Sequence, residues 1–335
     1  MIERAGHGTV TIGSVEKYIT DTAWEKGWIV PVKPAVERSE SVGIIGAGPG
    51  GLAAADMLRR AGIQVTVYDR HDRAGGLMTY GIPSFKLEKS VVMRRIKLLE
   101  QGGVNIVLNC EIGKDLSFAD LRQKHDAVLI ATGVYKSNDF KAPGSGAQGI
   151  VRAIDYLTAS NRKSFGDAVE DFDNGKLNAS GKRVVVIGGG DTAMDCVRTA
   201  IRQGATSVKC LYRRDRANMP GSQHEVRNAE EEGVEFVWLT APKGFAGGDT
   251  VTGVMVRKMR LGAPDASGRQ TPEVVEGADY VEPADLVIKA LGFSPEDLPE
   301  LWGVPEIVVT DWKTIKAQDR KSTRLNSSHV VISYA

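Results

Sequence analysis

The same order of a short apolar run, a glycine-rich turn and an amphipathic stretch occurs twice in this chain. The first copy runs from Ser41 through the turn 46–51 to Tyr68, and the second runs from Arg183 through the turn 188–193 to Tyr212. Each copy predicts a strand, a tight turn, a helix and a second strand. Such alternation is typical of parallel sheets covered by helices on both faces. We therefore expect an α/β fold with two Rossmann-like dinucleotide-binding domains.

The first turn has the spacing GxGxxG between its strand and its helix. Gly46 suits a tight turn, Gly48 lets the backbone approach a pyrophosphate, and Gly51 lets the helix lie close to the strand. Asp69 ends the next strand about 20 residues on, where a carboxylate can accept hydrogen bonds from a ribose diol. The pattern favours a dinucleotide site over a glycine turn of purely structural use.

The second turn has the related spacing GxGxxA, but its second strand ends in Arg213 and Arg214 rather than in an acid. A carboxylate at this place would repel a 2′-phosphate, whereas guanidinium groups bind it through charge-assisted hydrogen bonds. The sequence therefore predicts NADPH rather than NADH at the second turn. The alternative is a solvated basic pair that binds no ligand.

Composition excludes several other classes of protein. The 335 residues suffice for two domains, and the net charge of +1 gives no bulk field that would attract nucleic acid or an anionic membrane. No apolar run reaches the roughly 18 residues of a membrane span, and the N-terminus lacks the apolar core of a signal peptide. Cys110, Cys196 and Cys210 are too scattered for a metal, iron–sulfur or dithiol centre. We expect a cytoplasmic protein with no metal site.

The residues after Asp69, RHDRAGGL, and the later turn Ala131–Gly133 resemble the FAD-binding motifs of the pyridine nucleotide-disulfide oxidoreductase superfamily. The strings GIPSFKLEK, VVVIGGGDTAMDCVRTAIRQGA and YRRDRANMPGSQHEVRNAEEEGVEF are similar to the small (β) subunit family of bacterial glutamate synthase, and the resemblance covers residues 5–318. The NADPH-oxidising modules of dihydropyrimidine dehydrogenase and of ferredoxin:NADP reductases are the alternative. The strings NMPGS and VRTAIRQGA favour glutamate synthase.

This resemblance implies that the NADPH-binding domain is inserted into the FAD-binding domain. It also implies that a hydride passes from NADPH to FAD. Electrons then leave through iron–sulfur clusters toward the large (α) subunit, which makes glutamate. Hydride transfer between two cofactors needs no side-chain acid or base, so no catalytic residue is assigned. The implied FAD contacts are Gly46, Gly48, Pro49, Gly50, Gly51, Asp69, Arg70, Gly76, Leu77, Lys86, Ala131, Thr132 and Gly133. The implied NADPH contacts are Gly188, Gly190, Asp191, Thr192, Arg213, Arg214, Ala290 and Gly292.

The motifs divide the chain into six expected segments. They are an N-terminal helix and linker (1–37), the first part of the FAD-binding domain (38–150), a connector (151–182), the NADPH-binding domain (183–289), an incomplete return to the FAD domain (290–318) and a tail (319–335). We expect a helix over 14–28, with Val15, Tyr18 and Ile19 on one apolar face.

Two departures from the family pattern concern the ends of the chain. Family members carry a cysteine-rich domain before the stretch that opens this chain, and iron–sulfur clusters are expected only in that domain. Residues 319–335 read DRKSTRLNSSHVVISYA, which matches the translation of a common sequencing adapter instead of the family's glycine-rich ending. We expect a non-native tail that leaves an open edge on the first sheet, and an inactive fragment is a further alternative.

Overall fold

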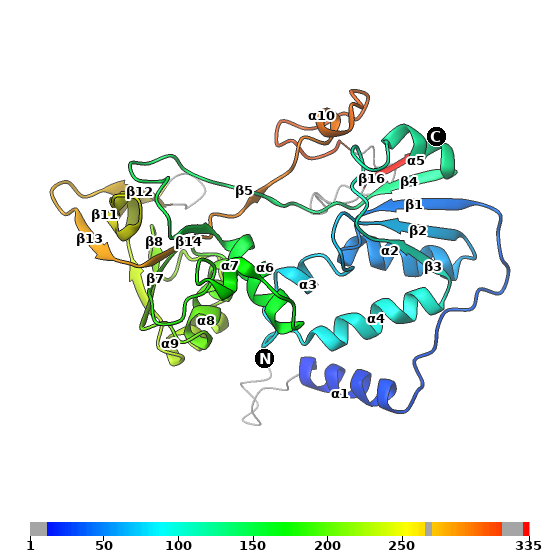
Figure 1. Ribbon diagram of the computed structural model, residues 1–335, viewed down its shortest axis with the longest axis horizontal. Coiled ribbons are helices and arrows are strands. Elements are labelled where there is room, and N and C mark those ends of the chain that lie inside the picture. The colour runs from blue at the N-terminus through cyan, green and yellow to red at the C-terminus, as the bar shows by residue number, and fades with distance from the viewer. Residues whose placement is uncertain (1–11, 265–269, 317–330, 335) are drawn as a thin grey trace.

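The chain folds into two layered units joined by extended segments (Figure 1), as described by a computed structural model of residues 12–264, 270–316 and 331–334. Both units contain a parallel sheet, as the repeated motif predicts. Among the described residues, no helix is long and apolar enough to cross a membrane.

The first unit is built on a parallel sheet in the order β4-β1-β2-β3. Its strands are β1 (Ser41–Ile45), β2 (Gln64–Tyr68), β3 (Val104–Val107) and β4 (Ala127–Ile130). Its helices are α2 (Pro49–Arg60), α3 (Leu77–Tyr80), α4 (Lys89–Gln101) and α5 (Phe118–Lys124). The buried side chains of α2 and α4 pack together in one apolar cluster with the sheet. Those of α5 pack in a second cluster with other side chains of the sheet. Strands buried on both sides require the near-continuous apolar runs that the sequence shows.

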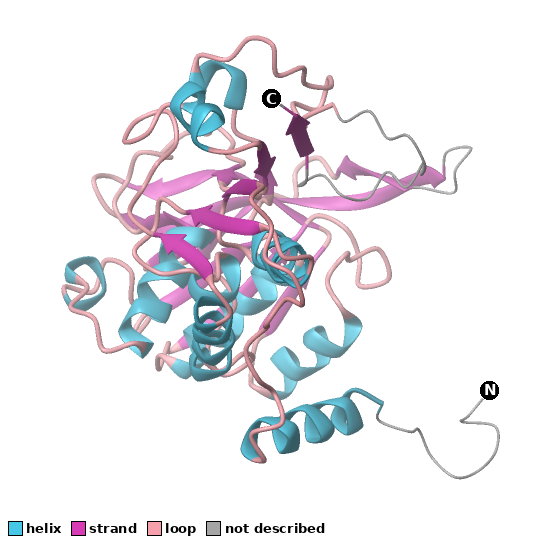
Figure 2. Cartoon of the chain, turned by 90° about the vertical axis from the view of Figure 1, so that its right-hand side faces the viewer, coloured by secondary structure: helices cyan, strands magenta, loops and turns pink. Residues whose placement is uncertain are grey.

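The N-terminal helix α1 (Ile12–Glu25) lies at the edge of the molecule, outside the helices that cover the sheets (Figure 2). It begins and ends earlier than expected, and Gly27, with a φ of 68°, follows its end. None of its residues is buried. The expected apolar face is exposed, and Tyr18 has a relative solvent accessibility of 73%. Its contacts to the first unit include those of Asp21 and Trp24 with Arg94.

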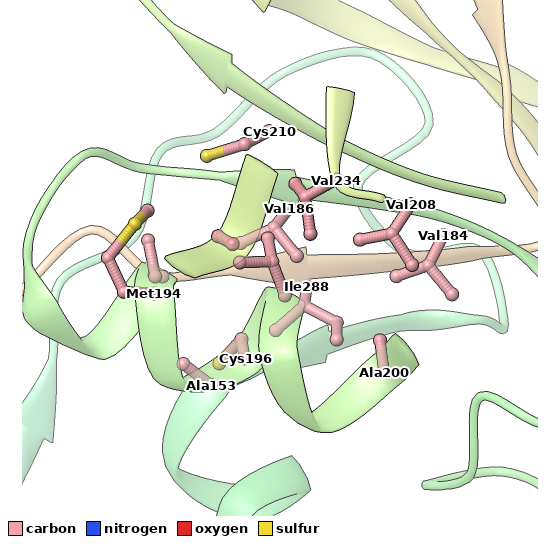
Figure 3. Close-up of a cluster of buried hydrophobic side chains, with 14 of the residues drawn as sticks. Ala153, Val184, Val186, Met194, Cys196, Ala200, Val208, Cys210, Val234 and Ile288 are labelled. Carbon is pink, nitrogen blue, oxygen red and sulfur yellow. The ribbon is translucent and has the colours of Figure 1, made fainter. Parts of the chain in front are cut away.

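The second unit has a parallel sheet in the order β6-β14-β7-β8-β9. Its strands are β6 (Ile150–Arg152), β7 (Arg183–Ile187), β8 (Ser207–Tyr212), β9 (Glu235–Trp238) and β14 (Leu286–Lys289). Its helices are α6 (Ala153–Ser164), α7 (Glu170–Asp173), α8 (Asp191–Arg202) and α9 (Gln223–Glu231). The apolar residues of α8 recur with helical spacing, so Met194 and Ala200 are wholly buried against the sheet (Figure 3). Val197 of the same helix is also wholly buried.

An antiparallel layer, which the sequence did not lead us to expect, packs on the same parallel sheet. Its strands are β10 (Thr240–Gly247), β11 (Val251–Pro264), β12 (Gln270–Val274) and β13 (Tyr280–Pro283). Val254 and Val256 of β11 alternate inward and join the core of β7, β8 and β14. The second unit therefore has three layers.

Residues 151–182, expected to be a connector, instead contribute to the body of the second unit. β6 pairs in parallel with β14, and α6 buries Tyr156 and Leu157 in the core that α8 also fills. The polar composition of this segment hid an amphipathic helix, because only one side of α6 is apolar.

Two extended segments connect the units. The outgoing strand β5 (Lys136–Ser137) pairs antiparallel with the returning strand β15 (Phe293–Ser294), and Asn138 N–H donates to Gly292 O at 2.9 Å. After β15 the chain enters α10 (Leu298–Trp302), whose Leu298 packs in the first unit's core. The second unit is thus inserted into the first.

The open edge expected on the first sheet is absent, because β16 (Val331–Tyr334) pairs antiparallel with β4. The free backbone groups of an edge strand can pair with any extended segment, whatever the polarity of the residues before it. The rest of the expected tail lies outside the described residues.

Candidate functional site

The first glycine turn follows β1 and requires glycine at two positions for reasons internal to the protein. Gly46 has a φ of 108°, and a side chain there would clash with the carbonyl oxygen of Ala131. A side chain at Gly51 would clash with the carbonyl oxygen of Gly46, so the helix α2 could not approach β1. These two glycines shape the turn.

Gly48 is different. Its φ of −77° and ψ of −177° suit any residue, and a Cβ built on it would meet no atom within 4 Å. Gly190 of the second turn is the same, with a φ of −94°, a ψ of 178° and nothing within 4 Å. Each of these glycines precedes the N-terminus of a twelve-residue helix, α2 or α8. The open space at a helix N-terminus fits the pyrophosphate of a dinucleotide.

Asp69 is buried beside the first turn and is already bound by the protein. Its Oδ2 accepts from Ala47 N–H at 2.7 Å, and its Oδ1 accepts from His71 N–H at 2.9 Å and lies 2.8 Å from His71 Nδ1. Burial alone would raise the pKa of this carboxyl, but the bonds from His71 and Ala47 lower it. A carboxylate has about four acceptor positions, so about one remains for a ribose. The predicted ribose contact stays a prediction, and Asp69 also holds the glycine turn in place.

The other predicted FAD contacts gather at the same turn. A Cβ on Gly76 would lie 2.8 Å from Gly48 Cα, so the Gly-Gly pair touches the turn, and α3 begins at Leu77. Ala131 N–H donates to Ile45 O at 2.8 Å, which places the turn 131–133 beside Gly46. Pro49 and Gly50 form the first turn of α2.

A pocket of about 320 Å³ opens at the carboxyl ends of β1 and β2. It is lined by Asp69, Arg70 and Thr132, which the sequence predicts as contacts, and by Tyr135, Glu296 and Trp302, which it does not. The Arg70 guanidinium pairs with Glu296 at 3.0 Å and lies 5.1 Å from the centre of the Tyr135 ring. No local motif could indicate Glu296, because it reaches the pocket only through the return of the chain from the second unit.

Lys86 contacts the second unit rather than the first glycine turn, and its predicted contact with FAD stays a prediction. Its Nζ lies 2.8 Å from Asp195 Oδ1 and 3.1 Å from Glu225 Oε2, both in the second unit. The segment after α3 leaves the first sheet and runs toward α8, which places Lys86 at the contact between the two units.

The second glycine turn, like the first, begins with a glycine whose place a larger residue could not take. Gly188 has a φ of 152° and lies against the carbonyl oxygen of Ala290, while Ala193 is wholly buried between helix and strand. The loop before α9 covers the turn: Gly221 N–H donates to Gly189 O at 2.9 Å, and Ser222 N–H donates to Asp191 Oδ1 at 3.2 Å. The sequence NMPGS signalled the family but not this contact.

Arg213 and Arg214 follow the end of β8, as predicted. Within the described part of the chain neither guanidinium has a carboxylate partner, whereas the neighbouring Arg216 pairs with Glu230 at 2.7 Å. Arg214 Nε is buried and has no hydrogen-bond partner among the described residues. Two uncompensated cations at this strand end fit a bound phosphate. Thr192 lies in the first turn of α8, and Gly292 lies in the linker beside Asn138.

A larger pocket, of about 900 Å³, lies between the units. The first unit contributes the rings of His71, Tyr80 and Tyr135, and the second unit contributes residues of β6 and α6. The wall of this pocket is therefore aromatic on the side of the first unit, and residues of both units line the pocket.

The family model for pyridine nucleotide-disulphide oxidoreductases matches residues 40–328. The chain is 77% identical over 320 residues to a putative glutamate synthase [NADPH] small chain of Cereibacter sphaeroides, covering 96% of this chain and 77% of the relative. The chain belongs to the glutamate synthase small-chain family. The glutamate synthase [NADPH] small chain of Azospirillum brasilense is 64% identical, and this chain spans 66% of its length.

Solved structures resemble this chain in fold at lower sequence identity. FprA of Mycobacterium tuberculosis in complex with NADPH has a TM-score of 0.65 at 20% identity, covering 77% of this chain and 71% of that one. Thioredoxin reductase of Lactococcus lactis in the FR conformation has a TM-score of 0.56 at 19% identity, covering 84% and 86%. These likenesses show the fold.

Membership of this family confirms the expected fold class and the expected kind of enzyme. The chain is an NADPH-dependent flavoprotein oxidoreductase, with FAD and NADPH as its cofactors. The individual contacts to the cofactors are proposals, which the open space at Gly48 and Gly190 supports.

Proposed function

We propose that this chain is the electron-input module of a glutamate synthase. NADPH binds at the second glycine turn and FAD at the first, and electrons pass from FAD through iron–sulfur clusters to a large subunit that forms glutamate. The observation that carries the proposal is the matched pair of open glycines, Gly48 and Gly190. One lies beside β2, which the buried Asp69 follows. The other lies beside β8, which is followed by two arginines that have no carboxylate partner among the described residues.

The residues have distinct roles in this proposal. The N-termini of α2 and α8 face the two pyrophosphates, and Gly48 and Gly190 keep the approach free. Arg213 and Arg214 hold the 2′-phosphate of NADPH. The two cofactors supply the hydride chemistry when bound, and the chain orients them and keeps the units together.

The partner and the compartment are also proposals. The relatives from Cereibacter sphaeroides and Azospirillum brasilense carry the name small chain, which supports a large (α) subunit as the electron-accepting partner. Iron–sulfur clusters would connect the two. A cytoplasmic location suits NADPH as donor and three unpaired cysteines.

Anaerobic rapid mixing of the FAD-loaded chain with NADPH tests the module directly. We expect the flavin absorbance to be bleached by NADPH and much more slowly by NADH, and an artificial dye to be reduced in turnover. Glutamate should form from glutamine and 2-oxoglutarate only when the large subunit and the iron–sulfur clusters are added. A flavin that NADPH leaves oxidised, or glutamate made by this chain alone, would contradict the proposal.

A further inference from the structure

Two adjacent side chains of the first unit reach into the second unit at one place. Phe85 and Lys86 lie between α3 and α4. Lys86 Nζ pairs with Asp195 on α8 at 2.8 Å and with Glu225 on α9 at 3.1 Å. The Phe85 ring lies 5.0 Å and 3.8 Å from the guanidinium carbons of Arg198 and Arg202, both on α8.

The acceptors of Lys86 belong to a larger set of charges that hold α8 and α9 together. Arg198 binds Glu225 at 2.8 Å and Glu232 at 2.7 Å, and Arg202 also pairs with Glu232. Asp195 and Arg198 are both buried, at 9% and 8% exposed. Ion pairs of partly buried groups are screened by salt less than exposed pairs are, so the contact of Lys86 depends less on ionic strength than that of a typical surface pair.

This contact differs from the others that join the units. Asn161 and Arg162 of α6, and Asp167 in the loop after it, also contact the first unit. Lys86 instead connects to α8, the helix whose N-terminus forms the second glycine turn, and Asp195 lies one turn after Asp191. Lys86 therefore fixes the helix that carries the pyridine nucleotide site.

We propose that Lys86, supported by Phe85, is a positioning residue for hydride transfer: it fixes α8, and with it the pyridine nucleotide site, at the correct place relative to the FAD-binding unit. The inference rests on the proposed function. Since misplacement of reacting groups by about 1 Å can cost about a hundredfold in rate, a loosened α8 should slow hydride transfer without loss of either cofactor.

The test compares Lys86→Met, Lys86→Arg and Asp195→Asn in the FAD-loaded chain, with Lys243→Gln as the matched control. Lys243 forms its ion pair with Asp279 at 2.6 Å inside the second unit. Rapid mixing with NADPH gives the limiting rate of flavin reduction and the Kd separately. We expect Lys86→Met and Asp195→Asn to lower the limiting rate about tenfold or more, with the Kd and the FAD content nearly unchanged. Lys86→Arg should restore most of the rate.

Hydrogen exchange of the FAD-loaded chain without NADPH provides a readout that does not depend on activity. Amides of the segment 81–88 and of α8 should exchange faster in Lys86→Met than in Lys243→Gln. A limiting rate equal to that of the control, or unchanged exchange, overturns the inference. Loss of FAD from Lys86→Met also overturns it, because Lys86 would then be a FAD contact. Failure of NADPH to reduce the unaltered chain would instead refute the proposed function, while the exchange experiment would still test the contact.

Discussion

Glycine at the two turns serves two different purposes, which side-chain geometry separates. Gly46 and Gly51 are required by the protein itself, because a Cβ would strike backbone oxygen atoms. Gly48 and Gly190 have ordinary backbone angles and open space in front of them. Because no described residue would meet a side chain at those two positions, we expect a bound ligand to occupy the open space.

This difference predicts selective loss of each cofactor. Gly48→Ala should fold with a melting temperature close to that of the unaltered chain and lose FAD, while Gly190→Ala should keep FAD and lose NADPH affinity. Each variant serves as the control for the other, and both can be measured by flavin absorbance after dialysis and by NADPH titration. Gly51→Ala should instead lower the melting temperature. Retention of FAD by a folded Gly48→Ala would place the pyrophosphate elsewhere.

The lowered pKa of Lys89 leads us to predict that the stability of the protein rises with pH in the alkaline range. Burial lowers the pKa of its ammonium to about 8, and its Nζ donates to the carbonyl oxygens of Met78, at 2.9 Å, and Ile82. Between pH 8 and the unfolded pKa of about 10.4, the unfolded chain holds a proton that the folded chain has lost. Stability attributable to this group therefore rises with pH in that window and is level below it.

Urea unfolding of the unaltered chain and of Lys89→Met at pH 7 and pH 9 would measure this effect. The difference in unfolding free energy between the two proteins should change by about 1 kcal/mol or more, with the unaltered chain gaining at pH 9. Lys176→Gln, at an exposed ion pair with Asp171, is a suitable control and should show no such change. An equal difference at both pH values would contradict the shifted pKa.

At the scale of single elements, we predict that the two arginines after β8 determine the choice of pyridine nucleotide. Changing Arg213 to Ser and Arg214 to Asp together should weaken NADPH binding far more than NADH binding, because the variant loses two phosphate donors and gains a repulsive carboxylate. Each lost charge-assisted bond costs about 1.5–3 kcal/mol, so the preference should fall by about tenfold or more. Titration of the FAD-loaded variant with both nucleotides measures the ratio. An unchanged ratio would remove these arginines from the site, and Arg216→Ser should leave the ratio unaltered.

The elements that could be predicted from the sequence are those whose signal is local. β1, β2, β7 and β8 have the expected bounds, because a buried parallel strand is a short apolar run between turns. The antiparallel strands β10–β13 were missed, since their inward and outward residues alternate weakly around several glycines and lysines. The amphipathic α6 was hidden by its polar side.

The site divides in the same way. The glycine turns, Asp69 and the arginine pair come from contiguous motifs, and the structure places them where the motif predicts. Glu296 and Tyr135 at the first pocket, and the contact of Lys86 with Asp195, join residues far apart in the chain. These contacts depend on how the two units are placed relative to each other, and no local sequence pattern predicts that placement.

For the whole molecule, the insertion of one unit into the other has a testable consequence. The second unit has its own two cores, and both of its connections pass through the pairing of β5 with β15. Residues 138–292 produced alone should fold cooperatively and bind NADPH without FAD. Circular dichroism melting and NADPH titration would check this, with Gly190→Ala in the same fragment as the control. A fragment that fails to fold, or one that binds NADPH no better than that control, would contradict the independence of the unit.

The insertion also fixes an order of events during synthesis. Leu298 and Val304 complete the core that contains Phe118 and Leu121, yet the whole second unit separates them in the chain. At about 5–20 residues per second, the ribosome needs on the order of ten seconds to make the intervening stretch. During that time the face of the first sheet that α10 later covers remains accessible on the nascent chain. We therefore expect chaperones to bind nascent chains that end before α10, and to release them once residues 298–304 have emerged.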